Sequence, residues 1–424
     1  MQIEVDRSPL LSESRVLPIH RKILAFSFIG WVFDFYDLLL LTFLVASTSI
    51  VADLGLSRYQ VSVLLGAALA LTAVGGLVGG ALADRFGRKP LLIATILVYS
   101  CGTLLSGLAT GMGSLLVARA ITGLGVGGEW AVANALVGET VPPHVRGRYG
   151  SYLQSGAAVA RFLATVMAYS LAPLIGWRWS FILSALPALI VVLIRRQMPE
   201  SDVWLASRRR MQQQPSEVGG LPRGLTQMLG PALRTTTVRA FTVTTLTMAA
   251  YWFKTIWLPT YFSEIRGLSA GEATRLFFMD QFGSIVGYVS FGFASDRFGR
   301  RPSFALFSLL KAVGMVVITV GWDAAEPHRG MLLAFMFLVG FGEGNWGCIG
   351  PLLSELYPTS VRAAALGIIY NLARGVQFLA PVVIAWIASY SSFGAGIALA
   401  APFSVLAGLM VWTLPETKGV RLAA

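Results

Sequence analysis

Five acidic and five basic side chains lie inside long apolar stretches of this chain, where they could move protons and hold anions. A charge in hydrocarbon is costly unless it is paired or faces water, so each of them is a candidate functional residue. The equal numbers predict pairing across a shared polar cavity. The acidic residues are Asp34, Asp37, Glu129, Asp280 and Glu343, and the basic residues are Arg119, Arg161, Lys254, Lys311 and Arg374.

The carboxylates are the candidates for carrying protons, because the three histidines all fall in connecting segments. Asp34 and Asp37 are three residues apart, so they share one face of a helix. Two carboxylates in a poorly solvated site hinder each other's ionisation, which allows the pair to load and release a proton. The alternative is that one of them only pairs with Arg119 or Arg161 for packing. We predict that at least one of the two aspartates handles protons.

The composition of the 424-residue chain is that of an integral membrane protein. Hydrophobic residues make up 55% of it, charged residues only 13%, and the mean hydropathy is +0.68. So few charges cannot cover the water-facing surface of a soluble protein of this size. The net charge of +12 then comes from basic loops between membrane spans, and no nucleic-acid partner is expected. Cys101 and Cys348 lie in apolar runs, so no disulfide framework is predicted.

Twelve apolar runs are long enough to cross a bilayer, which takes about 20 residues of helix. We therefore predict an all-α membrane protein of twelve transmembrane helices in two pseudo-symmetric six-helix bundles. The predicted parts are an N-terminal tail (1–22), a first bundle (23–196), a linker (197–237), a second bundle (238–414) and a C-terminal tail (415–424). The predicted spans are 24–50, 59–83, 90–109, 113–138, 149–173, 177–195, 239–262, 272–294, 302–321, 330–353, 364–389 and 394–413.

The positions of lysine and arginine set the expected orientation. Most of the 33 basic residues fall in segments that are cytoplasmic if the N-terminus is inside. The first 22 residues lack a short apolar core followed by a small-residue cleavage site, so we interpret them as a retained tail. We expect a multi-pass inner-membrane protein with both termini and the linker in the cytoplasm.

One polar turn occurs twice, between two apolar runs each time. It spans Gly80–Pro90 and Gly292–Pro302, and both copies contain Asp-Arg-Phe-Gly-Arg. Other motifs repeat at a common offset: Glu139 and Arg146 return as Glu355 and Arg362, and Pro199-Glu200-Ser201 returns as Pro415-Glu416-Thr417. A fixed period indicates an internal duplication. Parallel six-span repeats predict a substrate site near mid-membrane, where the two halves meet.

The duplicated turn resembles the signature loop of the major facilitator superfamily of transporters, which lies between spans 2 and 3 and between spans 8 and 9. The resemblance covers nearly the whole chain and implies secondary active transport by alternating access. It also implies a charge cluster that latches the cytoplasmic side while the outer side is open; the alternative is that these arginines only set topology. The residues assigned to this gate are Gly80, Asp84, Arg85, Arg88, Asp296, Arg297, Arg300, Glu139, Arg146, Glu355 and Arg362.

Three further motifs resemble the proton-coupled organic-acid branches of this superfamily, which include sialate, metabolite and aromatic-acid symporters. They are Asp34-x-x-Asp37, Gly128-Glu129-Trp130 and Pro199-Glu200-Ser201-x-x-Trp204. The stretch from Arg119 to Gly125 is similar to the span 4 motif, whose arginine is tied to proton coupling. The resemblance implies proton-coupled symport, with the coupling residues Asp34, Asp37, Glu129 and Arg119.

The resemblance also implies which buried cations face the substrate, since Arg161, Lys254 and Arg374 lie on spans that line the cavity in this superfamily. Arginine presents a planar fork that matches a carboxylate, so a small organic anion is the expected substrate. Lys311 lies on a span that is peripheral in this fold, and a structural role is expected for it. The other residues assigned to the site are Gln154, Tyr251, Trp130, Gln281, Trp346, Tyr370 and Asn371.

Other chemistries are disfavoured. The run Gly123–Gly128 matches a dinucleotide-binding fingerprint, but it lies inside an apolar span rather than after a strand, so we interpret it as close helix packing. No Walker-type loop, membrane-embedded histidine cluster or catalytic pair is present, so no nucleotide hydrolysis, cofactor, metal or enzyme activity is expected. A sugar or polyol transporter of the same fold and a drug-type proton antiporter stay open as alternatives. The expected partners are a small organic anion, protons and the lipid bilayer, with the protein acting as a monomer.

Overall fold

The computed structural model describes residues 16–195, 200, 205, 226–358 and 361–420. In this part of the chain the regular structure is helical, and no strand occurs. Most of the predicted N-terminal tail and of the 197–237 linker lies outside the described residues.

The first group of helices contains six bilayer-length spans. A π-helical turn (Met167–Leu171) joins α7 to α8, and Gly176, at φ 80°, interrupts α8. Glycine adopts positive φ readily, so the chain can reverse there, and the sixth span begins at the next residue. The helices are α2 (Pro18–Ser47), α3 (Ile50–Asp53), α4 (Arg58–Phe86), α5 (Arg88–Gly107), α6 (Met112–Thr140), α7 (Arg146–Val166) and α8 (Ala172–Arg195).

The second group contains six more spans, of which the last three are each built from two helices. A 3₁₀ turn (Glu343–Asn345) joins α15 to α16, and another (Gln377–Leu379) joins α17 to α18. The helices are α11 (Arg234–Thr260), α12 (Ala270–Phe298), α13 (Arg300–Thr319), α14 (Trp322–Ala325), α15 (Arg329–Gly342), α16 (Trp346–Leu356), α17 (Arg362–Val376), α18 (Ala380–Tyr390), α19 (Phe393–Ala398) and α20 (Ala400–Met410).

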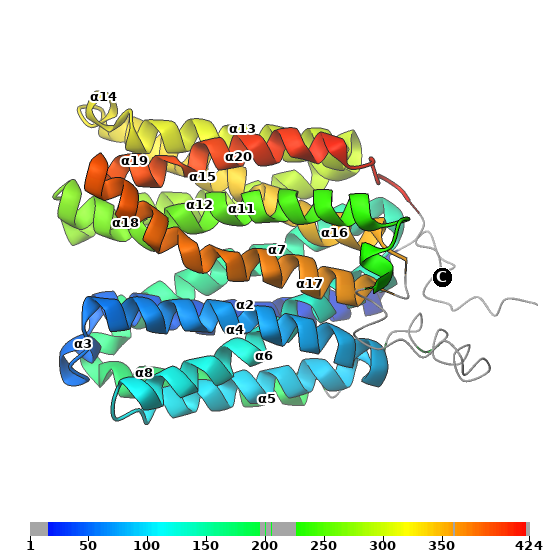
Figure 1. Cartoon of the computed structure of the whole chain (residues 1–424), viewed down its shortest axis with the longest axis horizontal. Helices are drawn as coiled ribbons and strands as arrows, with labels where there is room; N and C mark the ends of the chain where they lie inside the picture. Colours follow the sequence, from blue (N-terminus) through cyan, green and yellow to red (C-terminus); the bar gives the residue numbers. More distant parts are fainter. Residues whose placement is uncertain (1–15, 196–199, 201–204, 206–225, 359–360, 421–424) are drawn as a thin grey trace, which may run out of the picture.

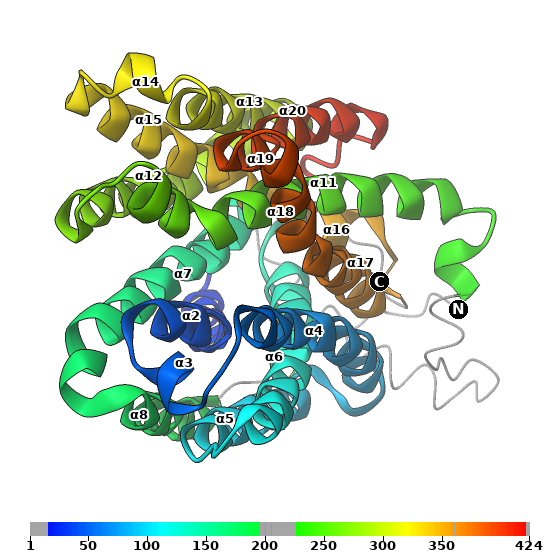
Figure 2. The same ribbon diagram turned by 60° about the vertical axis from the view of Figure 1, so that its left-hand side comes forward.

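The two groups lie side by side, with their long helices roughly along one axis (Figure 1). Figure 2 shows α2–α8 on one side of the molecule and α11–α20 on the other. Between the groups, α17 packs against α4 and α6, while α12 and α16 pack against α7. The substrate site expected between the halves therefore has to be built on these helices.

Eight helical stretches in the described part of the chain are long and apolar enough to cross a bilayer. One of them, Pro143–Leu186, runs through Gly176 and so covers parts of two spans. Helices α11 and α12 are not among the eight, and they carry the charged residues Lys254 and Asp280. The twelve-helix fold predicted from the sequence is confirmed.

Close helix packing explains the glycine-rich runs. A Cβ atom at Gly127 on α6 would lie 2.2 Å from the backbone oxygen of Thr72 on α4. A Cβ atom at Gly340 on α15 would lie 1.9 Å from the backbone oxygen of Asp280 on α12. Small residues allow transmembrane helices to approach this closely. The packing interpretation of Gly123–Gly128 is confirmed, because Gly123 and Gly125 also contact neighbouring backbones.

Gly340→Val should lower the free energy of unfolding by roughly 1–3 kcal/mol, the usual cost of overpacking, because α15 and α12 would have to move apart. The measurement is the thermal unfolding midpoint of the purified protein. Gly113→Val is the matched control, since nothing lies within 4 Å of a Cβ atom built there. Equal midpoints for the two variants would contradict this account of the packing.

Candidate functional site

A small cavity lies between the two helix groups. The first group contributes Phe35 from α2 and residues 154 and 157 from α7. The second contributes side chains from α11, α12, α16 and α17. Five residues predicted to bind substrate are among the lining residues, which are Phe35, Gln154, Ala157, Met248, Tyr251, Trp252, Tyr288, Trp346, Tyr370 and Arg374.

A stacked aromatic pair, of which Tyr370 lines the cavity, carries a guanidinium. The rings of Trp130 and Tyr370 stack with centroids 3.5 Å apart, and Trp130 Nε1 donates to Gln154 Oε1 at 3.0 Å. Arg374 Nη2 donates to the Tyr370 hydroxyl at 3.1 Å. Arg374 is 1% exposed, and its Nη1 has no hydrogen-bond partner among the described residues. A guanidinium with unused donors in a cavity wall can bind an anion.

Next to the cavity, Glu343 is the centre of a buried charge cluster. Its Oε2 accepts from Arg161 Nη1 on α7 at 2.9 Å, so this ion pair joins the two helix groups. Its Oε1 contacts the Lys254 ammonium and lies 3.8 Å from Lys311 Nζ. Lys254 Nζ also donates to both carboxylate oxygens of Asp280, at 2.9 and 3.2 Å. Three cations and two carboxylates thus form one cluster.

This arrangement differs from the sequence-based expectation in several respects. Arg161 and Lys254 are predicted to face the substrate, but both pair with Glu343, and Lys254 also pairs with Asp280. These two carboxylates are predicted to be buried, with no role in the site. Lys311, for which a structural role is predicted, belongs to the same cluster. Its presence among the buried charges was the available signal. A contact between α13 and the turn at Glu343 is not visible in local sequence.

Two other predicted substrate residues lie away from the cavity lining. Asn371 is fully buried and its Nδ2 donates to the backbone oxygens of Gly127 and Gly367, both at 3.0 Å. It therefore fastens α17 to α6 across the two groups. Gln281 is partly buried on α12 next to Asp280, and its Oε1 has no partner among the described residues.

Two of the predicted coupling residues, Asp37 and Arg119, form a polar layer inside the first group. Asp37 on α2 accepts a hydrogen bond from Thr103 on α5 and lies 3.7 Å from Arg119 Nη1 on α6. Arg119 Nη2 also donates to the backbone oxygen of Asp37 at 2.9 Å. Glu129 accepts from Thr95 at 2.9 Å. The structure thus brings Asp37 and Arg119 together, whereas Glu129 has a different hydroxyl partner, Thr95.

Asp34 is fully buried on α2, one helical turn before Asp37.

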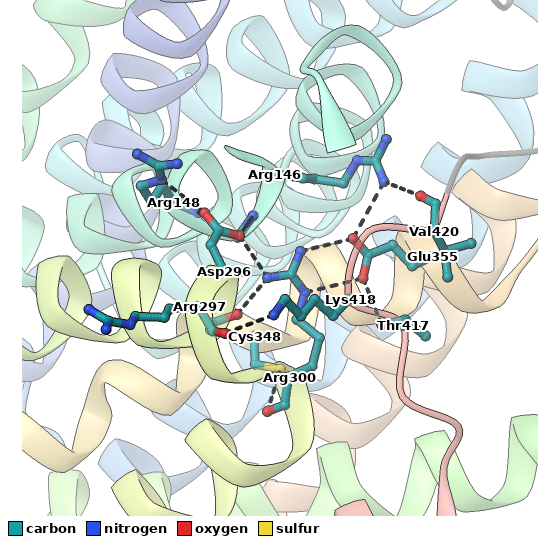
Figure 3. Close-up of polar contacts among 12 residues, drawn as sticks. Arg146, Arg148, Asp296, Arg297, Arg300, Cys348, Glu355, Thr417, Lys418 and Val420 are labelled. Atoms are coloured by element: carbon teal, nitrogen blue, oxygen red, sulfur yellow. Dashed lines mark hydrogen bonds and ion pairs between the residues drawn. The ribbon is translucent and has the colours of Figure 1, made fainter. Parts of the chain in front are cut away.

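At one end of the molecule, charged side chains tie the two groups together (Figure 3). Asp296, at the end of α12, accepts from the backbone N–H groups of Gly147 and Arg148, both at 3.1 Å. These belong to the first turn of α7, where N–H groups lack helical partners and the helix dipole favours a negative charge. Arg148 Nε and Arg300 Nη1 also donate to Asp296, at 3.0 and 2.8 Å. We call this end of the molecule the latch.

Two crossed ion pairs extend the latch. Arg146 of the first group lies 3.4 Å from Glu355 of the second, and Arg362 of the second lies 3.8 Å from Glu139 of the first. Each glutamate also pairs within its own group, Glu139 with Arg88 at 3.3 Å and Glu355 with Arg300 at 3.1 Å. The motifs that repeat in the sequence therefore meet in space, each contacting the other copy.

Residues 416–420 contribute to the latch. Glu416 accepts from the backbone N–H groups of Arg300 and Arg301 at the start of α13, at 2.9 and 3.1 Å. Thr417 donates to Glu355 at 2.6 Å, and Lys418 donates to the Arg297 backbone oxygen at 2.7 Å. In the first half, Glu200 caps the start of α5 in the same way, through Arg88 and Lys89.

The side chains of some predicted gate residues take no part in these contacts. Arg85 and Arg297 are exposed, each with its guanidinium over the ring of the following phenylalanine. Gly87 and Gly299, at φ 110° and 109°, turn the chain sharply enough that the arginine after the glycine points inward instead. Gly80 is buried within α4. The side chain of Asp84 lies outside the described part of the structure, so its role stays a prediction.

Asp296→Asn should favour opening at the latch end, because it removes a charge that several donors share. Losing a charged acceptor costs about 1.5–3 kcal/mol, or roughly a ten- to hundredfold change in the open population. Ser151→Cys, in a background with Cys101 and Cys348 replaced by serine, is the reporter, since Ser151 packs against Gly347 across the two groups. Thiol labelling should accelerate accordingly. Asp323→Asn, in an exposed pair with Arg266, is the control, and equal labelling rates would remove Asp296 from the latch.

Comparisons with known proteins bear on the whole chain. The sequence matches the Major Facilitator Superfamily over residues 26–279 and 240–423. It is 32% identical to a Cupriavidus pinatubonensis protein named as a 4-methylmuconolactone transporter, covering 93% of this chain and 90% of that protein. It is 29% identical to the sialic acid transporter NanX of Escherichia coli, covering 94% and 95%.

The fold has a solved counterpart as well. The structure of the proton:xylose symporter XylE bound to 6-bromo-6-deoxy-D-glucose superposes with a TM-score of 0.78, at 23% identity, over 95% of this chain and 97% of that chain. At this identity the likeness concerns the fold alone. Together with the duplicated signature turn and the cavity between two six-span groups, the matches show that this chain belongs to the Major Facilitator Superfamily of transporters.

Proposed function

We propose that this protein is a secondary active transporter that carries a small organic anion together with protons. In this proposal the cavity between the two helix groups opens alternately to either side of the inner membrane. The latch residues then lie on the cytoplasmic side with both termini, in keeping with the distribution of lysine and arginine along the chain. We also propose that the halves 23–196 and 238–414 move as separate units, and that a monomer suffices because one chain builds both the cavity and the latch.

The observation that carries the proposal is an excess of buried positive charge at the cavity. Arg374 lines the cavity directly. Beside it, the cluster around Glu343 holds three cations against two carboxylates. Buried charges are tolerated when they are paired, so an incoming carboxylate would stabilise this region and a neutral molecule would not.

The lining of the cavity favours a compact, flat body for the anion. Six of its ten lining side chains are aromatic, namely Phe35, Tyr251, Trp252, Tyr288, Trp346 and Tyr370. Aromatic faces bury apolar area and stack on planar groups. One relative is named for an acid, sialic acid, and the other for 4-methylmuconolactone. Their names and the charge of the site support an organic acid over a sugar or an amine drug.

For proton coupling we propose the polar layer of α2, α5 and α6. Asp37 contacts both Thr103 and Arg119, so protonation of its carboxylate would remove the charge that attracts the Arg119 guanidinium and allow these helices to shift. Asp34 is a second candidate, because it is fully buried one helical turn from Asp37 on the same face of α2. Glu129 remains a further candidate through Thr95.

Arg374→Gln should weaken binding of the transported acid by about 1.5–3 kcal/mol, as expected for a lost charge-assisted hydrogen bond, or roughly ten- to hundredfold in Kd. The purified protein would be screened by thermal shift with sialic acid, benzoate, 3-phenylpropionate, xylose and benzylamine, and the best acid measured by calorimetry. The neutral amide of that acid should bind weakly to the wild type.

Arg266→Gln is the matched control for this substitution, since Arg266 pairs with exposed Asp323 and is not among the residues that line the cavity. If the amide binds as well as the acid and Arg374→Gln changes neither, the buried cations are structural. A sugar or polyol would then be the better candidate substrate.

Asp37→Asn should abolish uphill uptake driven by a pH gradient, because its side chain cannot take up and release the coupling proton. Exchange of labelled for unlabelled acid across proteoliposome membranes should continue, since exchange needs no net proton movement. Asp53→Asn, at an exposed site, is the control. Uphill uptake by Asp37→Asn would place the proton path elsewhere.

A further inference from the structure

We propose that Glu343 competes with the carboxylate of the transported anion for Arg161, and that Lys311 takes over Glu343 once it is displaced. The inference rests on the proposed function, because it assumes an anionic substrate. It assigns a role to two residues of the second group that would otherwise count as fixed ion-pair partners.

The first argument is the position of the cluster along the molecule. At about 1.5 Å per residue, Gln154 and Arg161 on α7 stand roughly 12 and 22 Å from Arg146 in the latch. On α12, Tyr288 and Asp280 stand roughly 12 and 24 Å from Asp296. Gln154 and Tyr288 line the cavity, so the cluster lies beyond the cavity, on the side away from the latch. Opening on that side must separate Arg161 from Glu343, which belong to different helix groups.

The second argument is the divided environment of the Glu343 carboxylate. Oε2 faces the first group, through Arg161 Nη1 at 2.9 Å, and also lies 3.4 Å from Ser284 Oγ. Oε1 faces two lysines of its own group, Lys254 and Lys311. When Arg161 leaves, Glu343 therefore keeps counter-charges, whereas Arg161 also leaves behind the hydroxyls of Tyr251 and Ser284, which belong to the second group. Arg161 is the partner that then requires a new anion.

The third argument is the state of Lys311. It is fully buried, its Nζ is 3.8 Å from Glu343 Oε1, and it has no hydrogen-bond partner among the described residues. Glu343 lies in the 3₁₀ turn between α15 and α16, where the helical pattern is already interrupted. A small rotation of its carboxylate toward α13 would complete the Lys311 pair. Such a movement satisfies a buried ammonium that is incompletely paired here.

When a carboxylate enters, each of the three cations of the Glu343 cluster has its own carboxylate. Arg161 pairs with the incoming anion, Lys254 with Asp280, and Lys311 with Glu343. The route is short, because residues 154, 157 and 161 share one face of α7 and the first two line the cavity. Arg161 Nη1 also donates to the Tyr251 hydroxyl at 3.3 Å, and Tyr251 lines the cavity. A neutral analogue cannot displace Glu343, so the exchange selects for negative charge.

The first test is Glu343→Gln, which removes the internal competitor. Calorimetry would use the tightest binder among sialic acid, benzoate and 3-phenylpropionate, together with its amide. The acid should bind about tenfold tighter than to the wild type, while the amide should be unaffected. Glu272→Gln, in an exposed pair with Arg329, is the matched carboxylate control and should change neither affinity. Unchanged or weaker binding of the acid by Glu343→Gln overturns the competition.

The second test is a double-mutant cycle with Lys311→Met. In the wild-type background this substitution should weaken acid binding about tenfold, because displaced Glu343 loses its acceptor, and Lys311→Arg should restore it. In the Glu343→Gln background the effect should largely disappear. Equal weakening in both backgrounds would mean that Lys311 acts on the anion directly, which overturns its role as the acceptor of Glu343.

The double variant also covers the case in which Glu343→Gln fails to fold. Glu343→Gln with Lys311→Met keeps the same net charge in the cluster as the wild type, and it should still bind the acid more tightly than Lys311→Met alone. If neither the wild type nor any Glu343→Gln variant binds one of the acids, the proposed anion substrate is wrong and the competition falls with it. If the wild type binds and the Gln variants bind no better, the proposed function stands and only the competition is refuted.

Discussion

A charge buried among transmembrane helices must have a counter-charge, and this requirement determines how the centre of the molecule is built. Glu343 satisfies it for cations from α7, α11 and α13 at once. A single carboxylate thereby fixes three helices, and Asp280 adds α12 through Lys254. Since α7 belongs to the first group and the others to the second, the position of one side chain affects the relation between the groups.

In the latch, carboxylates are balanced by the N–H groups at helix starts as well as by cationic side chains. The first turns of α5, α7 and α13 carry N–H groups that lack helical partners, and the caps are the carboxylates of Glu200, Asp296 and Glu416. Two of these caps act within one group, and Asp296 alone caps a helix of the other group. Separation of the groups at this end therefore leaves the start of α7 uncapped, which gives the closed arrangement a local energetic preference.

Much of the fold was predictable from sequence because its signals are local or repeated. Apolar run length gave the spans, with α2 starting earlier than predicted, at Pro18. The duplicated turn identified Arg88, Asp296 and Arg300 as latch residues, although it did not distinguish them from Arg85 and Arg297. That distinction depends on the chain reversal at the intervening glycine, which decides which side chain points inward.

The central site was less predictable, because its contacts join residues far apart in sequence. Buried charges identified the right set, but nothing local indicated that Arg161 would meet Glu343 or that Lys311 would lie beside them. Arg374 and the aromatic walls were assigned to the site by resemblance, and they do line the cavity. Asn371 was assigned in the same way, yet its amide serves helix packing.

The crossed pairs of the latch have a consequence for the origin of the molecule. Arg146 with Glu355 and Arg362 with Glu139 are one contact made twice, which is the pattern of an isologous interface between two identical subunits. A six-helix ancestor with one such arginine and one such glutamate would form the latch as a symmetric homodimer. The Arg161–Glu343 pair has no such counterpart, because Gln377 and Gly127 stand at the equivalent positions of the repeat. The latch can therefore predate the fusion of the two halves, whereas the central ion pair requires that the halves have diverged.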